Sequence, residues 1–144
     1  MSYNIHKKAL VDSGFWYALL DEREQHYADA QNKAEVLLSL RYLIPWPTLY
    51  ETLHTRFTTR HLIMRKFESF LKRPNAEFLD DHPYKDKALE LTLAMAGRSK
   101  SSPSLVDNVL RMIIEDSNVK VDAVFTFNRR DFTEICARRN IELM

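Results

Sequence analysis

Short apolar runs alternate with helix-compatible segments along the whole of this sequence. Turn residues or prolines bound the strand candidates, which are 8–11, 42–44, 76–79, 121–127 and 141–143. Segments with helical spacing or composition fill the intervals between them, at 15–20, 28–40, 48–59, 62–71, 84–96, 103–116 and 131–139. Strands that are separated by helices form a mostly parallel sheet with helices on its faces. The sequence therefore predicts an α/β sandwich of three layers.

The length and composition are those of one ordinary globular domain. The chain has 144 residues, of which 45% are hydrophobic and 28% charged. A chain of this size buries enough surface to fold without disulfide bonds or structural metal ions, and we expect residues 1–144 to form a single domain. The single cysteine, Cys136, excludes an internal disulfide and a cysteine-cluster zinc site. The only glycines, Gly14 and Gly97, exclude the glycine-rich phosphate loops of P-loop and dinucleotide-binding proteins.

No feature of the sequence points to a membrane. No apolar run approaches the roughly 18 residues that a membrane-spanning helix needs. The apolar stretch near the N-terminus is too short for a signal peptide, and a single cysteine suits a reducing compartment. We therefore expect a cytoplasmic protein without a membrane partner.

Polar side chains follow the predicted strands at the points where those strands end. Asp12 directly follows the first strand, and Glu51 lies in the first turn of the helix after the second. Asp107 lies in the first turn of the helix predicted over 103–116. Asn128 follows the fourth strand, with Asp131 three residues further on. Open parallel sheets bind ligands at the carboxyl ends of their strands. We expect these side chains to meet at one edge of the sheet.

Each of these positions also has a plainer interpretation. Thr48 and Glu51 have the spacing of a capping box, and Asp107 stands where the helix macrodipole favours an acid. Asp12 can close a turn, and Asp131 can cap the last helix. Taken together, however, crowded carboxylates repel one another unless a cation neutralises them, and Mg²⁺ and Mn²⁺ prefer oxygen ligands. The convergence favours metal-assisted hydrolysis of a phosphodiester.

Four short patterns occur in order along the chain, namely ALVDSGFW, PTLYETL around position 51, SLVDNVL around position 107 and VFTFNRRDF. Together they resemble the PIN-domain ribonucleases, and most closely the VapC-like toxins of toxin–antitoxin pairs. The resemblance implies a PIN-like fold and a Mg²⁺- or Mn²⁺-dependent endoribonuclease, a hydrolase that cuts RNA with an activated water. It implies that Asp12, Glu51 and Asp107 bind the metal.

The fourth position departs from the commonest form of the family, because Asn128 stands where an aspartate is usual. An asparagine keeps one carbonyl oxygen but no charge, so we expect one firm metal site and a weaker second one. Asp131 is a candidate to compensate for the lost charge. Ser13 and Thr126 match small hydroxyl positions of the family, where they either orient water or a ligand or serve as ordinary turn and strand hydroxyls.

The same asparagine motivates a different reading of the chain. A PIN-like fold with an incomplete set of acids can be a catalytically impaired RNA-binding or regulatory module. A third class uses Asp12 as a phospho-acceptor. The Asp-x-Asp signature of haloacid-dehalogenase-like enzymes is missing, since Ser13 and Gly14 follow Asp12.

The net charge of +1 disfavours tight, nonspecific binding of nucleic acid. Basic residues nevertheless gather near the expected site, and the alternative to RNA binding is a solvated helix face. Arg56 and Arg60 are spaced as i, i+4 neighbours on a helix. The candidate phosphate contacts are Arg56, Arg60, Arg98, Lys100, Arg129 and Arg130. The family resemblance further implies a homodimer and a small antitoxin protein as partners.

Overall fold

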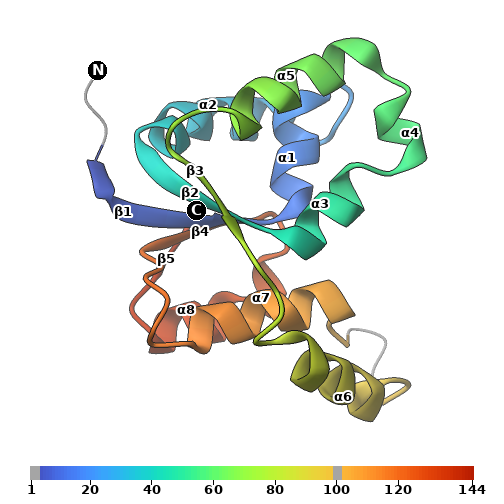
Figure 1. Cartoon of the computed structure of the whole chain (residues 1–144), viewed down its shortest axis with the longest axis vertical. Coiled ribbons are helices and arrows are strands. Elements are labelled where there is room, and N and C mark those ends of the chain that lie inside the picture. The colour runs from blue at the N-terminus through green and yellow to red at the C-terminus, as the bar shows by residue number, and fades with distance from the viewer. Residues whose placement is uncertain (1–3, 99–101) are drawn as a thin grey trace.

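The structure, a computed structural model, describes residues 4–98 and 102–144, and its centre is a single parallel sheet (Figure 1). The five strands lie in the order β3-β2-β1-β4-β5. All four neighbouring pairs are parallel, which places the carboxyl ends of the strands at one edge. The strands are β1 (Asn4–Val11), β2 (Leu40–Pro45), β3 (Ala76–Leu79), β4 (Ala123–Phe125) and β5 (Glu142–Leu143).

Helices cover both faces of this sheet, as predicted. Figure 1 shows α1, α2 and α5 on one side and α6, α7 and α8 on the other, with α3 and α4 at the margin of the first layer. The first group is α1 (Ser13–Leu20), α2 (Tyr27–Leu38), α3 (Trp46–Thr52), α4 (Thr55–Thr58) and α5 (His61–Leu71). The second is α6 (Lys85–Met95), α7 (Leu105–Glu115) and α8 (Thr133–Arg138), preceded by a 3₁₀ turn, η1 (Arg129–Asp131).

The alternation of side chains along the strands divides the core in two. Ala9 and Val11 of β1 and Phe125 of β4 pack on the α1 side, whereas Leu10 and Val124 pack on the α7 side. All five are buried, as is typical of parallel strands covered on both faces. The continuous apolar runs in the sequence are thus explained by burial on both sides, which confirms the three-layer α/β sandwich.

The helix expected over 48–59 is wrong, because the chain breaks there into α3 and α4. Two hydroxyls turn back onto the helix backbone: Thr48 Oγ1 donates to Pro45 O and Thr52 Oγ1 to Thr48 O, each at 2.7 Å. His54 then adopts an extended conformation (φ −77°, ψ 168°) before α4 begins. Hydrogen bonds from threonine side chains to nearby backbone carbonyls disfavour a continuous helix.

Other boundaries near the C-terminal end also differ from expectation. The strand expected over 121–127 is limited to β4, because Thr126 leaves the strand and its hydroxyl accepts a bond from the Asn128 backbone N–H at 3.0 Å. The helix expected over 131–139 is η1 followed by α8. Phe132, and not Asp131, occupies the N-cap position of α8, so the expected capping role of Asp131 is wrong.

None of the helices in residues 4–98 and 102–144 combines the length and the apolar character that crossing a membrane requires.

Candidate active site

Asp12 is the buried centre of the site at the carboxyl end of β1. Its side chain is 6% exposed and caps α1, with Oδ1 accepting from the Ser13 backbone N–H at 2.8 Å. Oδ2 accepts from Thr126 Oγ1 at 2.9 Å. Thr126 follows β4, which pairs directly with β1, so the sheet order brings together two residues from opposite ends of the sequence. Both carboxylate oxygens are thereby held in place.

Glu51 joins the site through the N-terminal part of α1. Ser13 Oγ donates to Glu51 Oε1 at 2.8 Å, and the Tyr17 hydroxyl donates to the Glu51 backbone carbonyl. The capping box expected between Thr48 and Glu51 is absent, because the N-cap of α3 is Pro45 and Thr48 donates to its carbonyl. Freed from capping, the Glu51 carboxylate is tied to the neighbour of Asp12.

Burial and neighbouring negative charges raise the pKa values of Asp12 and Glu51. The pKa of Asp12 is raised to about 6, chiefly by burial and in smaller part by the charges of Asp107 and Glu51, against the lowering effect of the bonds from Thr126 and Ser13. Burial also raises the pKa of Glu51; the Ser13 hydroxyl lowers it and the charge of Asp107 raises it. Asp12, Glu51 and Asp107 therefore lie close enough to repel, in a site where the neighbouring charges are negative.

Asp107 fulfils the capping role that its position in the sequence allowed. Its Oδ2 accepts from the Ser104 backbone N–H at 3.2 Å, and its own N–H donates to Ser104 Oγ at 3.1 Å, which forms a capping box on α7. The other oxygen, Oδ1, has no hydrogen bond within residues 4–98 and 102–144. Asp107 is thus anchored by one oxygen and keeps the second available.

The donor set suits a hard divalent cation, but the side chains are not gathered into a finished cluster. Carboxylate oxygens are the ligands that Mg²⁺ and Mn²⁺ prefer. Among the described residues, however, no group of three or more His, Cys, Asp or Glu side chains is placed so that it could hold a metal ion. The structure brings Asp12 and Glu51 together through Ser13 and leaves Asp107 on its cap.

Asn128 turns its side chain toward Asp131. Its Nδ2 donates to Asp131 Oδ2 at 2.7 Å, and its backbone N–H donates to Thr126 Oγ1. Thr126 therefore links Asn128 to Asp12, since the same hydroxyl donates to the buried carboxylate. The acid expected to compensate for Asn128 instead orients its amide, which leaves the carbonyl oxygen of Asn128 as the group available to a ligand.

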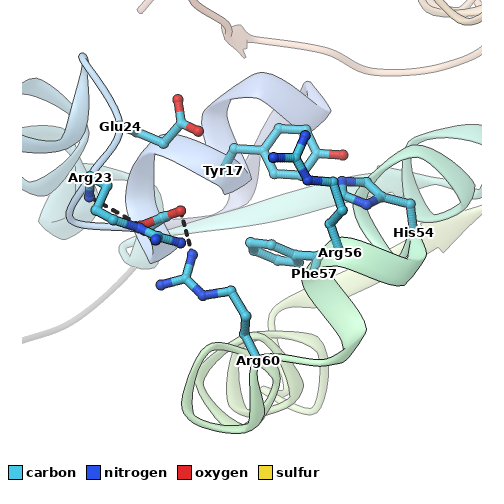
Figure 2. Close-up of a pocket in the computed structure, with 8 residues that line it drawn as sticks. Tyr17, Arg23, Glu24, His54, Arg56, Phe57 and Arg60 are labelled. Carbon is cyan, nitrogen blue, oxygen red and sulfur yellow. Dashed lines mark hydrogen bonds and ion pairs between the residues drawn. The ribbon is translucent and has the colours of Figure 1, made fainter.

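The candidate RNA-binding residues fall into three places. Arg129 and Arg130 are exposed in η1, directly after Asn128, and Arg98 is exposed after α6. Lys100 lies outside the described residues. The i, i+4 pairing on one helix is wrong for Arg56 and Arg60, because Arg56 lies in α4 while Arg60 precedes α5. Both line a cavity beside α1, which Figure 2 shows.

The three aromatic residues that follow Asp12 in the sequence can either pack in the core or stack a base, and one further residue of this region, Asp21, was not predicted. Phe15 and Trp16 are buried in the core, but Tyr17 is only partly buried and faces the cavity. Asp21, at the end of α1, accepts from Arg60 Nη1 at 2.5 Å. An acid at a helix C-terminus is unusual because it opposes the macrodipole, and this was the one signal that could have singled out Asp21.

The comparisons with known proteins agree with this architecture. No protein-family model matches the sequence, and no curated protein sequence matches it. Among solved structures, the chain is similar to one described as the crystal structure of VapBC2 from Rickettsia felis bound to a DNA fragment from their promoter. The TM-score is 0.54 at 14% identity, and the match covers 95% of this chain and 97% of that chain. The likeness is one of fold, and with the five-stranded parallel sheet it confirms the predicted PIN-like architecture.

Proposed function

We propose that this chain is a Mg²⁺- or Mn²⁺-dependent endoribonuclease that hydrolyses RNA phosphodiester bonds, and that it is the toxin of a toxin–antitoxin pair. The observation that carries the proposal is the buried Asp12, whose pKa is raised to about 6 by burial and by the charges of Asp107 and Glu51. Such a carboxylate is costly to the folded protein, and groups with pKa values perturbed in this way are concentrated at functional sites. The likeness in fold to a VapBC2 structure supports the toxin role.

In this proposal the metal is held by Asp12, Glu51 and Asp107. A divalent cation bound there supplies a Lewis acid that neutralises charge on the phosphate and activates water for attack. The Ser13 and Thr126 hydroxyls hold the carboxylates of Glu51 and Asp12 in fixed orientations. Bonds of this kind to ligand side chains typically improve metal affinity or activity by about 10–100-fold.

The remaining site residues act on the substrate and on the fourth position. Asp131 orients the amide of Asn128, whose carbonyl oxygen offers a neutral ligand to water or to a second ion. Exposed arginines beside it, Arg129 and Arg130, and Arg98 with Lys100 contact phosphates of the RNA. We further propose that residues 1–144 act as one domain in the cytoplasm, as a homodimer that a small antitoxin blocks.

A cleavage assay tests the proposal directly. With structured and unstructured RNAs in Mn²⁺ or Mg²⁺, the parent is expected to cleave and a chelator to stop it. Asp107→Asn is expected to lose roughly 100-fold in rate, since it removes one of the charged ligands that hold the cation, and the cation stabilises the charge on the reacting phosphate. The variant Ser104→Ala is the control, because it weakens the cap on α7 and keeps the carboxylate. Unchanged cleavage by Asp107→Asn would contradict the proposal.

A second prediction concerns Ser13, which bonds the Glu51 carboxylate. Ser13→Ala removes a bond that lowers the pKa of Glu51, so that pKa is expected to rise further. A carboxylate that must be ionised then requires a higher pH. We expect the acidic limb of the pH–rate profile to move to higher pH, with about a tenfold loss of rate below it. Ser39→Ala, which removes an exposed hydroxyl bonded to Val36 O, is the control and should leave the profile unchanged.

The second candidate function is a catalytically impaired module that binds RNA without cutting it. The observation that favours it is Asn128, which stands where the family usually has a carboxylate. Its amide donates a hydrogen bond to Asp131. Calorimetric titration separates the two. Heat of binding from Mn²⁺ at millimolar concentration, lost in Asp107→Asn, supports the nuclease. RNA binding with no detectable metal binding supports the module.

A further inference from the structure

A cavity of about 250 Å³ lies beside α1, between the end of that helix and α4, and none of the roles assigned above uses it as a site. Figure 2 shows side chains from α1, from the turn after it and from the 54–60 segment surrounding the cavity. Its volume is below the roughly 300–1,000 Å³ of pockets for drug-sized ligands. It is sized for one small unit of a larger molecule.

One wall of the cavity is aromatic. The Tyr17 ring lies 5.7 Å from His54 and 5.3 Å from Phe57, with the latter pair edge to face. His54 is exposed and Tyr17 half-buried, so rings remain accessible from the cavity side. Nucleobases stack on such rings with little dependence on sequence.

The lining of the cavity also carries more arginines than acids. Asp21 accepts from Arg60 at 2.5 Å and pairs with Arg23 at 3.4 Å. Burial opposes ionisation of Asp21, but hydrogen bonds from the Arg23 backbone N–H and the Arg60 guanidinium outweigh it and lower its pKa. Arg56 has no carboxylate partner among the described residues, and in Figure 2 it extends toward Tyr17 and His54. With three arginines against Asp21 and Glu24, the lining keeps one positive charge.

The cavity is joined to the acidic site by α1 itself. Tyr17 donates to the Glu51 backbone carbonyl, while Ser13, four residues earlier, donates to the Glu51 carboxylate. Four residues of α-helix rise about 6 Å, so the two places are one helical turn apart. Burial, together with the charges of Glu51, Glu24 and Asp12, raises the pKa of the Tyr17 hydroxyl to about 12.

We propose that this cavity binds one unpaired nucleotide next to the phosphate that is cut, with its base against Tyr17 and His54 and a phosphate on Arg56. The proposal rests on the nuclease function proposed above and adds a requirement for single-stranded RNA beside the cut. A paired base is held in its stack and cannot reach a side-chain wall of this kind.

Binding measured in a chelator tests this subsite without cleavage. The probes are a short oligouridylate, an abasic ribose–phosphate oligomer of equal length and an RNA duplex, each labelled with fluorescein. Their binding is measured by fluorescence anisotropy across a range of salt concentrations. Arg56→Ala is expected to weaken binding of both single strands about tenfold and to reduce the slope of log affinity against log salt by about 0.7, as one lost phosphate contact on a single strand does. Arg65→Ala removes an exposed arginine of α5 outside the cavity and should leave that slope unchanged.

His54 provides the matching test of stacking. It occupies the N-cap position of α4 without a side-chain bond to the helix, so its replacement removes no helix cap, and the ring contacts that it loses are those to Tyr17 and Phe57. His54→Ala should weaken oligouridylate binding at least fivefold, as loss of one base stack does, while His54→Tyr should retain it. On the abasic oligomer, His54→Ala should have no effect.

The outcomes separate the two proposals. If Arg56→Ala and Arg65→Ala bind the single strands alike, or if His54→Ala acts equally on the abasic oligomer, the subsite is wrong even when the parent cleaves RNA. The subsite is also wrong if Arg56→Ala weakens binding of the duplex as much as binding of the single strand, which would indicate a general electrostatic effect. It is wrong as well if neither Arg56→Ala nor His54→Ala changes RNA binding, which is the result expected of a cavity that binds a protein partner. If the binding effects appear and no RNA is cleaved, the subsite stands and the nuclease function fails.

Discussion

Replacing Asp12 with asparagine is expected to abolish RNA cleavage and, in the same protein, to raise the stability of the fold at pH 8. The cleavage is lost because the variant lacks the buried carboxylate at the centre of the acidic site. We expect a loss of at least about 100-fold, in line with removal of a ligand of the cation that stabilises the transition state. The rate is measured on the same RNA panel with Mn²⁺ present.

The gain in stability follows from the raised pKa of Asp12. In the unfolded chain this group loses its proton near pH 3.8, whereas in the folded protein it holds the proton to about 6. Stability contributed by this group is therefore full below pH 3.8 and is lost as the pH rises to about 6. Above that window the charged carboxylate costs the fold up to about 3 kcal/mol, from 1.36 kcal/mol per pKa unit. Asparagine also caps helices well, so α1 keeps its start.

Urea unfolding at pH 8 and at pH 4 checks this second part. The difference between Asp12→Asn and the parent should be large at pH 8 and shrink toward pH 4. Asp86→Asn, an exposed acid in the first turn of α6, is the control and should show no such trend. An Asp12→Asn protein that is less stable than the parent at pH 8 would show that the carboxylate is not under strain.

Addition of a divalent cation is expected to produce the other large effect. An ion that binds only the folded protein stabilises it by about 2.7 kcal/mol at a concentration 100 times Kd. For a chain of this size the change corresponds to a rise in Tm of about 8–10 °C. Mn²⁺ and Mg²⁺ should both raise the Tm of the parent at pH 8, and a chelator should reverse the shift.

The pH dependence of this shift identifies the group responsible. Since the pKa of Asp12 is raised to about 6, an ion that binds its carboxylate must displace a proton at lower pH. The metal-induced rise in Tm should therefore shrink as the pH falls below about 6. Differential scanning fluorimetry across this range is the measurement. A shift that Asp12→Asn retains in full would place the ion elsewhere.

Local sequence was enough to predict the fold, because each strand carries its own signal. The β3 strand has the predicted bounds, Ala76–Leu79, and α5 begins one residue before the predicted 62–71 helix. The apolar runs in β1 and β4 indicate strands buried on both faces, and the helices between strands leave only parallel connections. The parallel, layered architecture follows from these local patterns, whereas the order of the strands in the sheet was not predicted.

The details of the site depend on contacts between distant residues, which local patterns do not contain. Thr126 and Asp12 are 114 positions apart in the sequence, and Arg60 reaches Asp21 across 39 positions. The spacing of Thr48 and Glu51 fits a capping box. In the structure, however, the Glu51 carboxylate accepts a hydrogen bond from Ser13, and the Thr48 hydroxyl donates to the Pro45 carbonyl. Packing between elements decides which hydrogen-bond partner such a side chain has. At Ser104 and Asp107 the partner is the local one that the sequence predicts, since these residues form a capping box.

The order of the strands also has a consequence for synthesis of the protein. β1 is translated before the other four strands and lies in the middle of the sheet, yet its second neighbour, β4, is translated only after β2 and β3. A nascent chain therefore contains Asp12 and Glu51 well before it contains the threonine that bonds the buried carboxylate. Contacts of such long range form late in folding. Until the segment that contains Thr126 has been translated, the Asp12 carboxylate lacks one of its two hydrogen bonds and the acidic site is incomplete.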